Sequence, residues 1–277
     1  MSTRLASGLG RNHFRVESRY PLSDADILEH CPAVFADRPH ESRSTKYAYV
    51  STADIVRGLR KEGFEVFFAA QSRSMDEGML GFTKHLLRMR HASQIEAPVA
   101  NEIVMLGSHG GQSSIQLLAG GLRGMCMNRQ VYGNVFADIR IPHKGRNVVD
   151  DVIEGTYSIL GEFERADGMR EAMKATMLSD SEVAAFGKAA LELRWQEGKA
   201  PVSAADIVRV RRVEECKADL DTIYNVVQEN LVDKGGQPGR AATGRRMTTR
   251  GVRGLDENVK INRALHTLAA EMLKLKA

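Results

Sequence analysis

The sequence predicts an α+β fold, in which an antiparallel β-sheet with an early packed helix is followed by a helical C-terminal half. Segments rich in β-branched and aromatic residues lie between residues 47 and 146, and helix formers dominate after residue 147. The 277 residues are 43% hydrophobic and 27% charged, which is typical of a globular chain with a sizeable core. We expect a single domain over residues 1–277, without internal repeats.

The N-terminal segment, residues 1–46, is expected to be irregular because prolines and scattered charges interrupt any hydrophobic period. One short helix is predicted after Ser23, a residue type that favours helix N-caps. The segment has no apolar region typical of a secretory signal, and the sequence contains no apolar run of about 18 residues that would span a membrane. Three widely spaced cysteines, Cys31, Cys126 and Cys216, form no CxxC pair, which favours a reducing cytoplasm.

The sheet core is predicted over residues 47–146. A strand at 47–51 is followed by a helix at 52–63, in which Ile55, Val56 and Leu59 share one face and Gly63 ends the helix. The two glycines after His109 are typical of a tight hairpin. Alternating or continuous apolar patterns predict the remaining strands at 64–74, 82–91, 101–109, 113–118 and 131–143.

The helical part is predicted over residues 147–277. Ser179 and Glu182 have the spacing of a capping box at the start of one helix. A basic, glycine-rich loop is expected at 234–254, between two of the helices. The predicted helices cover 147–164, 179–196, 203–232 (as one or two long helices) and 256–276.

Charge is distributed unevenly along the chain. Residues 1–146 contain 19 basic and 14 acidic residues, residues 147–199 contain 6 and 11, and residues 200–277 contain 14 and 10. Two basic regions therefore flank an acidic one, and the sequence pI is about 9.0. This pattern predicts a polyanionic partner, although a solvated surface with uneven charge would produce it too.

One predicted strand carries a row of cations. In a strand over 82–91, Lys84, Arg88 and Arg90 share one face, which would form a track for phosphates. The alternative is the solvated outer face of a half-buried sheet. The end of the last predicted strand adds three further cations to the candidate set: Arg140, Lys144 and Arg146.

The loop at 234–254 contains six basic residues and no acid. It is not a nucleotide-binding P-loop, because Arg245 and Arg246 stand where that motif requires Lys and then Ser or Thr. Arginine and glycine together allow close approach to phosphates and bidentate contacts. The candidate phosphate-binding residues of this loop are Arg240, Arg245, Arg246, Arg250 and Arg253.

No cofactor or metal site is predicted. The eight histidines form neither HExxH nor a zinc-ligand spacing. The cluster at 107–114 contains His109 but no acid to orient it, so a hairpin is favoured over a catalytic site. An enzyme assembled from dispersed groups such as His109, Asn128 and His143 remains an alternative.

Several segments resemble the phage/plasmid-like protein family, a domain of unknown function that is encoded on prophages and conjugative plasmids. The resemblance extends over roughly residues 5–268. It is carried by SRSTKYAYVSTADIVRGLRKEGFEVFFAAQSR, FTKHLLRMRH, VMLGSHGG, RGMCMN and GRAATGRRMTTRGVRGLDENVKINRAL.

Two positions depart from the pattern of that family. Gly107 and Gly110 stand where it has Asn and Asp, and the sequence from Cys126 to Arg129 is Cys-Met-Asn-Arg where it has Cys-Thr-Asn-Gly. If those polar groups are catalytic in relatives, catalysis is not expected here. The order of strand, helix and three-stranded run also resembles, more weakly, the Rad-type single-strand annealing proteins, which form rings around single-stranded DNA.

These observations predict a non-enzymatic protein that binds single-stranded DNA and anneals strands as an oligomer or ring. The cations of the sheet would line one face, and those of the basic loop would close over the strand. The alternatives are a host-interaction or anti-defence protein that binds another protein through its acidic region 147–199, and the dispersed enzyme. Fold analogy alone does not decide among them.

Overall fold

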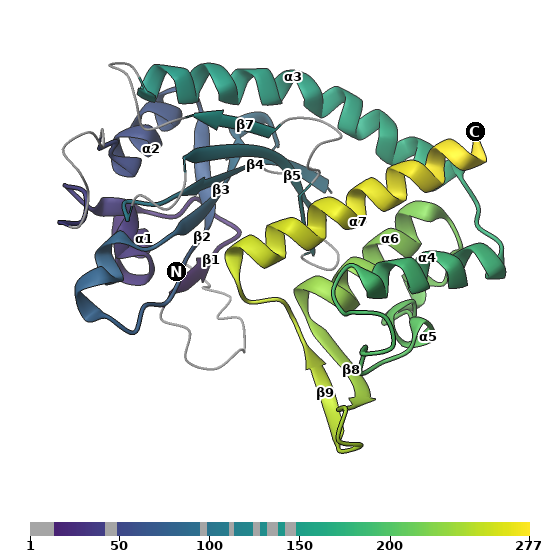
Figure 1. Ribbon diagram of the computed structural model, residues 1–277. Helices are drawn as coiled ribbons and strands as arrows, with labels where there is room; N and C mark the ends of the chain where they lie inside the picture. The colour runs from purple at the N-terminus through teal and green to yellow at the C-terminus, as the bar shows by residue number, and fades with distance from the viewer. Residues whose placement is uncertain are drawn as a thin grey trace. The chain divides into compact units, whose positions relative to one another are not determined.

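The computed structural model describes residues 14–41, 49–94, 99–110, 114–123, 128–131, 138–141 and 148–277. They form two compact units, Met1–Gly120 with Ala137–Gly161, and Gly121–Phe136 with Glu162–Ala277. The predicted α+β class is confirmed (Figure 1). The sequence predicts a single domain over residues 1–277, with the helical part from residue 147 in the same domain or in a closely packed subdomain.

The first unit is built on an antiparallel sheet. Its strands follow the order β1-β2-β3-β4-β5-β6, and β7 pairs with β5. β5 continues into the second unit, to which β6 belongs. The strands are β1 (Arg15–Glu17), β2 (Phe64–Gln71), β3 (His85–His91), β4 (Val99–Gly107), β5 (Ile115–Arg123), β6 (Asn128–Val131) and β7 (Asp138–Ile141).

Strands with buried, β-branched or aromatic side chains were predicted best. β2 to β5 lie within or overlap their predicted ranges, and β4 and β5 are neighbours as expected of a hairpin. β1 was missed because three residues are too few to show a period. The strand predicted at 47–51 is wrong for residues 49–51, where Ser51 instead caps the next helix and accepts a bond from the Asp54 N–H at 3.1 Å.

Helices α1 (Asp24–His30) and α2 (Thr52–Lys61) begin at serine caps, and Pro32–Phe35 and Glu77–Phe82 form 3₁₀ turns. Ile55, Val56 and Leu59 of α2 are buried as predicted, and Gly63 has a φ of +83° where the chain turns into β2. α3 (Val148–Ala175) begins in the first unit and continues into the second. Its first half packs closely on α2, because a Cβ at Gly58 would lie 3.3 Å from Val149 and Ile153.

A buried ion triad lies within the sheet. Glu102 on β4 accepts bonds from Arg88 Nε at 2.6 Å and Arg90 Nε at 2.8 Å, and all three side chains are at most 9% exposed. Arg90 also lies over the Phe67 ring, 4.3 Å from its centroid. The face that carries Arg88 and Arg90 is therefore an internal surface on which both arginines bind Glu102.

The second unit contains α4 (Asp180–Glu192), α5 (Ala204–Ile207), α6 (Leu220–Gln228) and α7 (Leu255–Lys276). The capping box at α4 is confirmed, since Ser179 and Glu182 exchange both bonds. Buried apolar side chains of these helices form one core, including Phe186, Tyr224 and Leu265.

The long helices predicted at 203–232 are wrong in their extent. α5 ends after Ile207, a 3₁₀ turn covers Val213–Glu215, and α6 starts only after the Asp219 cap. α6 runs into a π-helical turn at Glu229–Asp233. Ser203 caps the helix at the predicted start, whereas the capping side chain of Asp219 interrupts a pattern that periodicity alone extends.

We predict that Glu102→Gln destabilises the protein by about 3–5 kcal/mol, because it removes the buried carboxylate that accepts bonds from both Arg88 and Arg90. The midpoint of urea unfolding, followed by circular dichroism, measures the change. Glu171→Gln is the control: it removes an exposed partner of Lys174 on α3 and should cost about 0–1 kcal/mol. Equal effects of the two substitutions would contradict the role of the triad.

The same carboxyl predicts a pH dependence. Burial alone would raise the pKa of Glu102, but Arg88 and Arg90 outweigh burial and hold that pKa below its usual value. Its contribution to stability is therefore present above the unfolded pKa of about 4.3 and is lost as the pH falls through the lower folded pKa. Unfolding midpoints measured between about pH 5 and pH 2 should therefore fall less steeply with decreasing pH in Glu102→Gln than in the unchanged protein.

Candidate nucleic-acid interface

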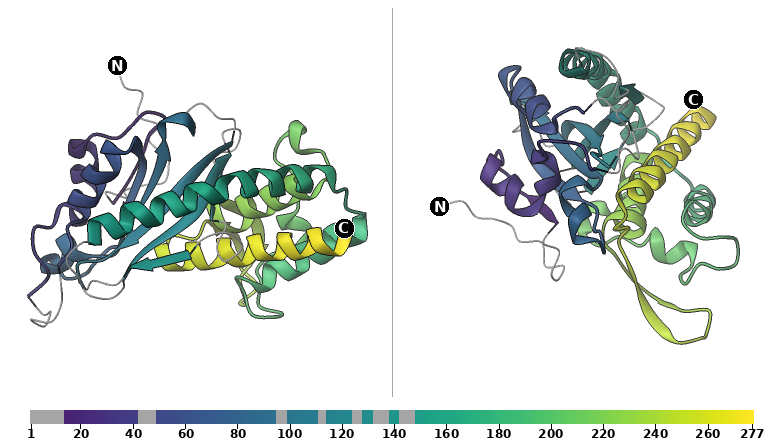
Figure 2. Two further views of the ribbon diagram at one scale, coloured as in Figure 1. Left: turned by 90° about the horizontal axis from the view of Figure 1, so that it is seen from above. Right: turned by 60° about the vertical axis from the view of Figure 1, so that its left-hand side comes forward.

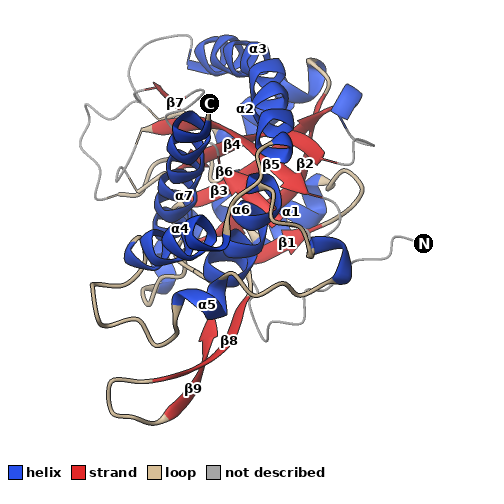
Figure 3. Ribbon diagram, turned by 90° about the vertical axis from the view of Figure 1, so that its right-hand side faces the viewer, coloured by secondary structure: helices blue, strands red, loops and turns tan. Residues whose placement is uncertain are grey.

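The basic stretch 234–254 forms a β-hairpin and not the loop that the sequence predicts. Strands β8 (Gly235–Arg240) and β9 (Arg246–Arg250) pair antiparallel. At the turn, Gly244 has a φ of +79° and donates to the Ala241 carbonyl at 2.8 Å. Figure 1, the right-hand view of Figure 2, and Figure 3 show this ribbon projecting from the helices of the second unit.

The arginines of the hairpin are exposed and gather on one face. Arg240 lies directly opposite Arg246, and Arg250 shares their face because it is four residues along the same strand. The opposite face points inward, where Gln237 and Thr249 are buried. Arg245 is exposed in the turn, and Arg253 is exposed beyond β9.

These charges are not compensated by acids. Within the part of the chain that the structure describes, no carboxylate forms an ion pair with Arg240, Arg245, Arg246, Arg250 or Arg253. Like charges directly opposite on paired strands are destabilising. The pair Arg240–Arg246 therefore costs stability in the free protein, and a polyanion would relieve that cost. We call the face that carries Arg240, Arg246 and Arg250 the hairpin face.

Backbone contacts hold the hairpin to the rest of the second unit, one beside the turn and one just beyond β9. The Arg240 N–H donates to the Pro201 carbonyl at 2.8 Å, and the Val252 N–H donates to the Val232 carbonyl at 2.7 Å. A Cβ at Gly251 would lie 2.0 Å from the Asp233 carbonyl oxygen, so this position requires glycine. The hairpin is therefore attached along both of its strands.

A buried carboxylate, Glu229, lies in the π-helical turn that leads into β8. Glu229, which is 1% exposed, accepts two bonds from Arg212 at 2.7 and 2.8 Å and one from Lys234 at 2.6 Å. Burial alone would raise the pKa of Glu229, but Arg212 and Lys234 hold it below its usual value. The one lysine of the basic stretch is thus used internally.

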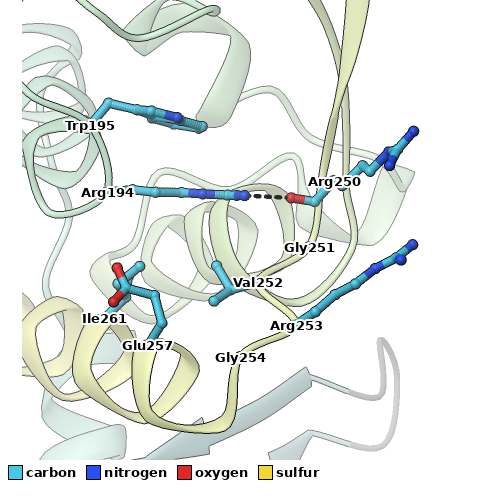
Figure 4. Close-up of a pocket in the computed structure, with 9 residues that line it drawn as sticks. All are labelled: Arg194, Trp195, Arg250, Gly251, Val252, Arg253, Gly254, Glu257 and Ile261. Carbon is cyan, nitrogen blue, oxygen red and sulfur yellow. Dashed lines mark hydrogen bonds between the residues drawn. The ribbon is translucent and has the colours of Figure 1, made fainter. Parts of the chain in front are cut away.

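A pocket of about 420 Å³ lies at the base of the hairpin (Figure 4). The Arg194 guanidinium stacks on Trp195, 4.6 Å from the ring centroid, and donates to the carbonyls of Leu231 and Arg250, the latter at 2.7 Å. Figure 4 shows Arg250 and Arg253 extending to the same side. The lining residues are Arg194, Trp195, Arg250, Gly251, Val252, Arg253, Gly254, Glu257 and Ile261.

Arg194 and Trp195 were missed from the sequence. The single tryptophan of the chain lines the pocket at the base of the hairpin, beside Arg250 and Arg253. The available signal was the Arg194-Trp195 dipeptide near the end of the helix predicted at 179–196, because an arginine beside a tryptophan is a common pair for stacking. Burial lowers the pKa of Arg194, and the charge of Glu257 opposes this effect.

Two of the cations predicted on the sheet, Arg88 and Arg90, are not available for a phosphate track. Arg88 and Arg90 share a face as expected, but they are buried and paired with Glu102, which corrects that assignment. Lys84 is half-buried just before β3, and Arg140 is exposed on β7. Lys144 and Arg146 lie outside the described residues.

The histidine of the dispersed enzyme alternative lies in a buried polar cluster of the first unit. Thr52 Oγ1 lies 2.9 Å from His85 Nε2 and 3.1 Å from His109 Nε2. Asn128 is in β6 of the second unit, and His143 lies outside the described residues. Among the described residues, no three His, Cys, Asp or Glu side chains are placed to hold a metal ion. None of the helices in the described ranges has the length and apolar character of a membrane span.

Comparison with known proteins identifies relatives over almost the entire chain. The family model "Domain of unknown function (DUF932)" matches residues 39–266. Two proteins of Escherichia coli (strain K12), "UPF0380 protein YafZ" and "UPF0380 protein YfjQ", are each 44% identical over 271 residues, which is 98% of this chain and 98% of each relative. No solved structure matches, so the weaker likeness to annealing proteins gains no support from this comparison.

We predict that Gly251→Ala destabilises the second unit by more than about 1 kcal/mol, because the added Cβ meets backbone that must shift. Urea unfolding followed by the emission of Trp195 reports on this unit. Gly168→Ala is the control, since its Cβ meets nothing within 4 Å on α3 and should stabilise the helix by up to about 1 kcal/mol. A neutral Gly251→Ala would show that the hairpin base is not closely packed.

Proposed function

The chain belongs to the family described as a domain of unknown function (DUF932), and on that premise we propose that it binds single-stranded DNA through the hairpin face. The observation that carries this proposal is the exposed pair of opposed arginines, Arg240 and Arg246, with which no carboxylate of the described residues forms an ion pair. Phosphate oxygens are the natural partners of such guanidinium groups.

The geometry of a β-ribbon supports an extended partner. Residues two apart along a strand are about 6.6 Å apart, a spacing that suits successive phosphates of an extended strand. Thr248 lies on the hairpin face between Arg246 and Arg250 and adds a hydroxyl donor. Because these contacts engage the backbone of the nucleic acid, they provide affinity without sequence readout.

Holding the phosphates leaves the bases accessible for pairing, so annealing of complementary strands is the activity that we expect from this binding mode. Annealing needs no catalytic base or cofactor. Assembly of several copies along a strand, as an oligomer or ring, would place successive hairpins on successive segments of DNA.

A partner protein docking on the acidic region 147–199 is less well supported. Four of its acidic residues already form ion pairs, which reduces the charge that a basic partner would meet. These pairs are Glu162–Arg165, Asp167–Arg170, Glu171–Lys174 and Glu182–Lys276.

We predict that Arg240→Ala with Arg246→Ala weakens binding of a labelled single-stranded oligonucleotide. Two lost phosphate contacts should reduce the slope of log affinity against log salt by roughly 1.4. The midpoint of thermal unfolding should not fall, because the substitutions remove a repulsive cross-strand pair. Fluorescence anisotropy across a salt series provides the measurement.

The matched control is Lys188→Ala with Lys217→Ala, which removes two exposed cations of the same unit outside the hairpin. It should leave the salt slope nearly unchanged. Binding that is absent, insensitive to salt, or reduced equally by both double variants would exclude the hairpin face as the DNA site. Tighter binding of a duplex than of its single strands would exclude the single-strand preference.

A further inference from the structure

We propose that the pocket at the base of the hairpin holds one unpaired nucleobase of the bound strand. This inference rests on the proposed function, because it assigns the occupant of a pocket that adjoins the hairpin face. Its volume of about 420 Å³ lies within the range of about 300–1,000 Å³ that is common for small-molecule sites. Figure 4 shows the residues that line it.

The stacked pair of Arg194 and Trp195 favours a flat, aromatic occupant. The guanidinium donates to the backbone carbonyls of Leu231 and Arg250, which fixes its orientation. These bonds lie in the guanidinium plane, so the face turned away from Trp195 remains suited to stacking. Unpaired bases are commonly bound by stacking on aromatic rings and on guanidinium planes.

Glu257 distinguishes a base from a phosphate as the occupant. Its carboxylate lines the pocket and would repel a phosphate placed beside it. The same carboxylate can accept a hydrogen bond from an exocyclic amino group, as acidic side chains do with the N4 amino group of cytosine. The pocket therefore favours amino-bearing bases over thymine.

The side chains at the pocket rim would hold the backbone of the same nucleotide. Arg250 and Arg253 are exposed and extend to one side of the pocket. Arg250 also belongs to the hairpin face, so a strand that follows this face reaches the pocket without a break. Phosphates would lie at the rim, and a base would enter between Arg194 and the apolar side chains of Val252 and Ile261.

The test combines two readouts on one titration. Anisotropy of a labelled 15-mer reports binding, and the emission of Trp195, the single tryptophan of the chain, reports occupancy of the pocket. With oligo-dC, both signals should change with the same midpoint. With an abasic strand of equal length, anisotropy should rise while the emission stays constant.

Glu257→Gln tests the contact to the base. Oligo-dC should bind about fivefold more tightly than oligo-dT, and this preference should fall in the variant, because a neutral amide oxygen is a weaker acceptor than a carboxylate and the amide N–H groups can donate to O4 of thymine. Glu257 is exposed near the start of α7, and an unchanged unfolding midpoint verifies that the variant folds. Asp256→Asn, also exposed in the first turn of α7 but outside the pocket lining, is the matched control and should keep the preference.

Each other outcome overturns the inference in a recognisable way. Binding without a change of emission leaves the proposed function standing and the pocket without a role. An equal change with the abasic strand shows that the pocket holds phosphate. A saturable change of emission with dCMP, without oligonucleotide binding, identifies a free-nucleotide site. If no strand binds by anisotropy and dCMP has no effect, both proposals fail.

Discussion

A charge that is buried in a protein must be compensated, and this constraint determines which cations of the chain remain available for a ligand. Each unit contains a buried glutamate held between two cations. Glu102 binds Arg88 and Arg90 in the first unit, and Glu229 binds Arg212 and Lys234 in the second. The cations beside these carboxylates stabilise the fold, and the arginines of the hairpin, which have no such partner among the described residues, are left to meet solvent or a polyanion.

The same constraint explains what could be predicted from the sequence. The period of two along 82–91 correctly indicated a strand that carries Arg88 and Arg90 on one face, but it cannot say whether that face is solvated. The answer depends on Glu102, which lies on the neighbouring strand. The contact with Glu102 depends on pairing between strands that are distant in the sequence. Charges counted along the chain do not show it, so Arg88 and Arg90 were wrongly assigned to a phosphate track.

The hairpin shows a related limit. Its strands contain two adjacent glycines and a proline, residues that are depleted in strands, so local propensity favours a loop. Backbone contacts to Pro201, Val232 and Asp233 override that propensity, and none of them is visible as a period in the sequence. The serine caps that start α1 and α4 were predictable because caps are local, whereas the pocket of Arg194 and Trp195 required the folded chain.

The double attachment of the hairpin also determines how the chain would respond to a protease. Arg245 and Arg246 lie exposed at the projecting turn, where trypsin-like enzymes find accessible arginine bonds. Because β8 is bonded to Pro201 and β9 continues into the bond between Val252 and Val232, a cut at the turn would leave both strands in place. Limited proteolysis would therefore produce a second unit that is cleaved at the turn but still assembled. A ligand bound to the hairpin would slow cleavage at Arg245 and Arg246.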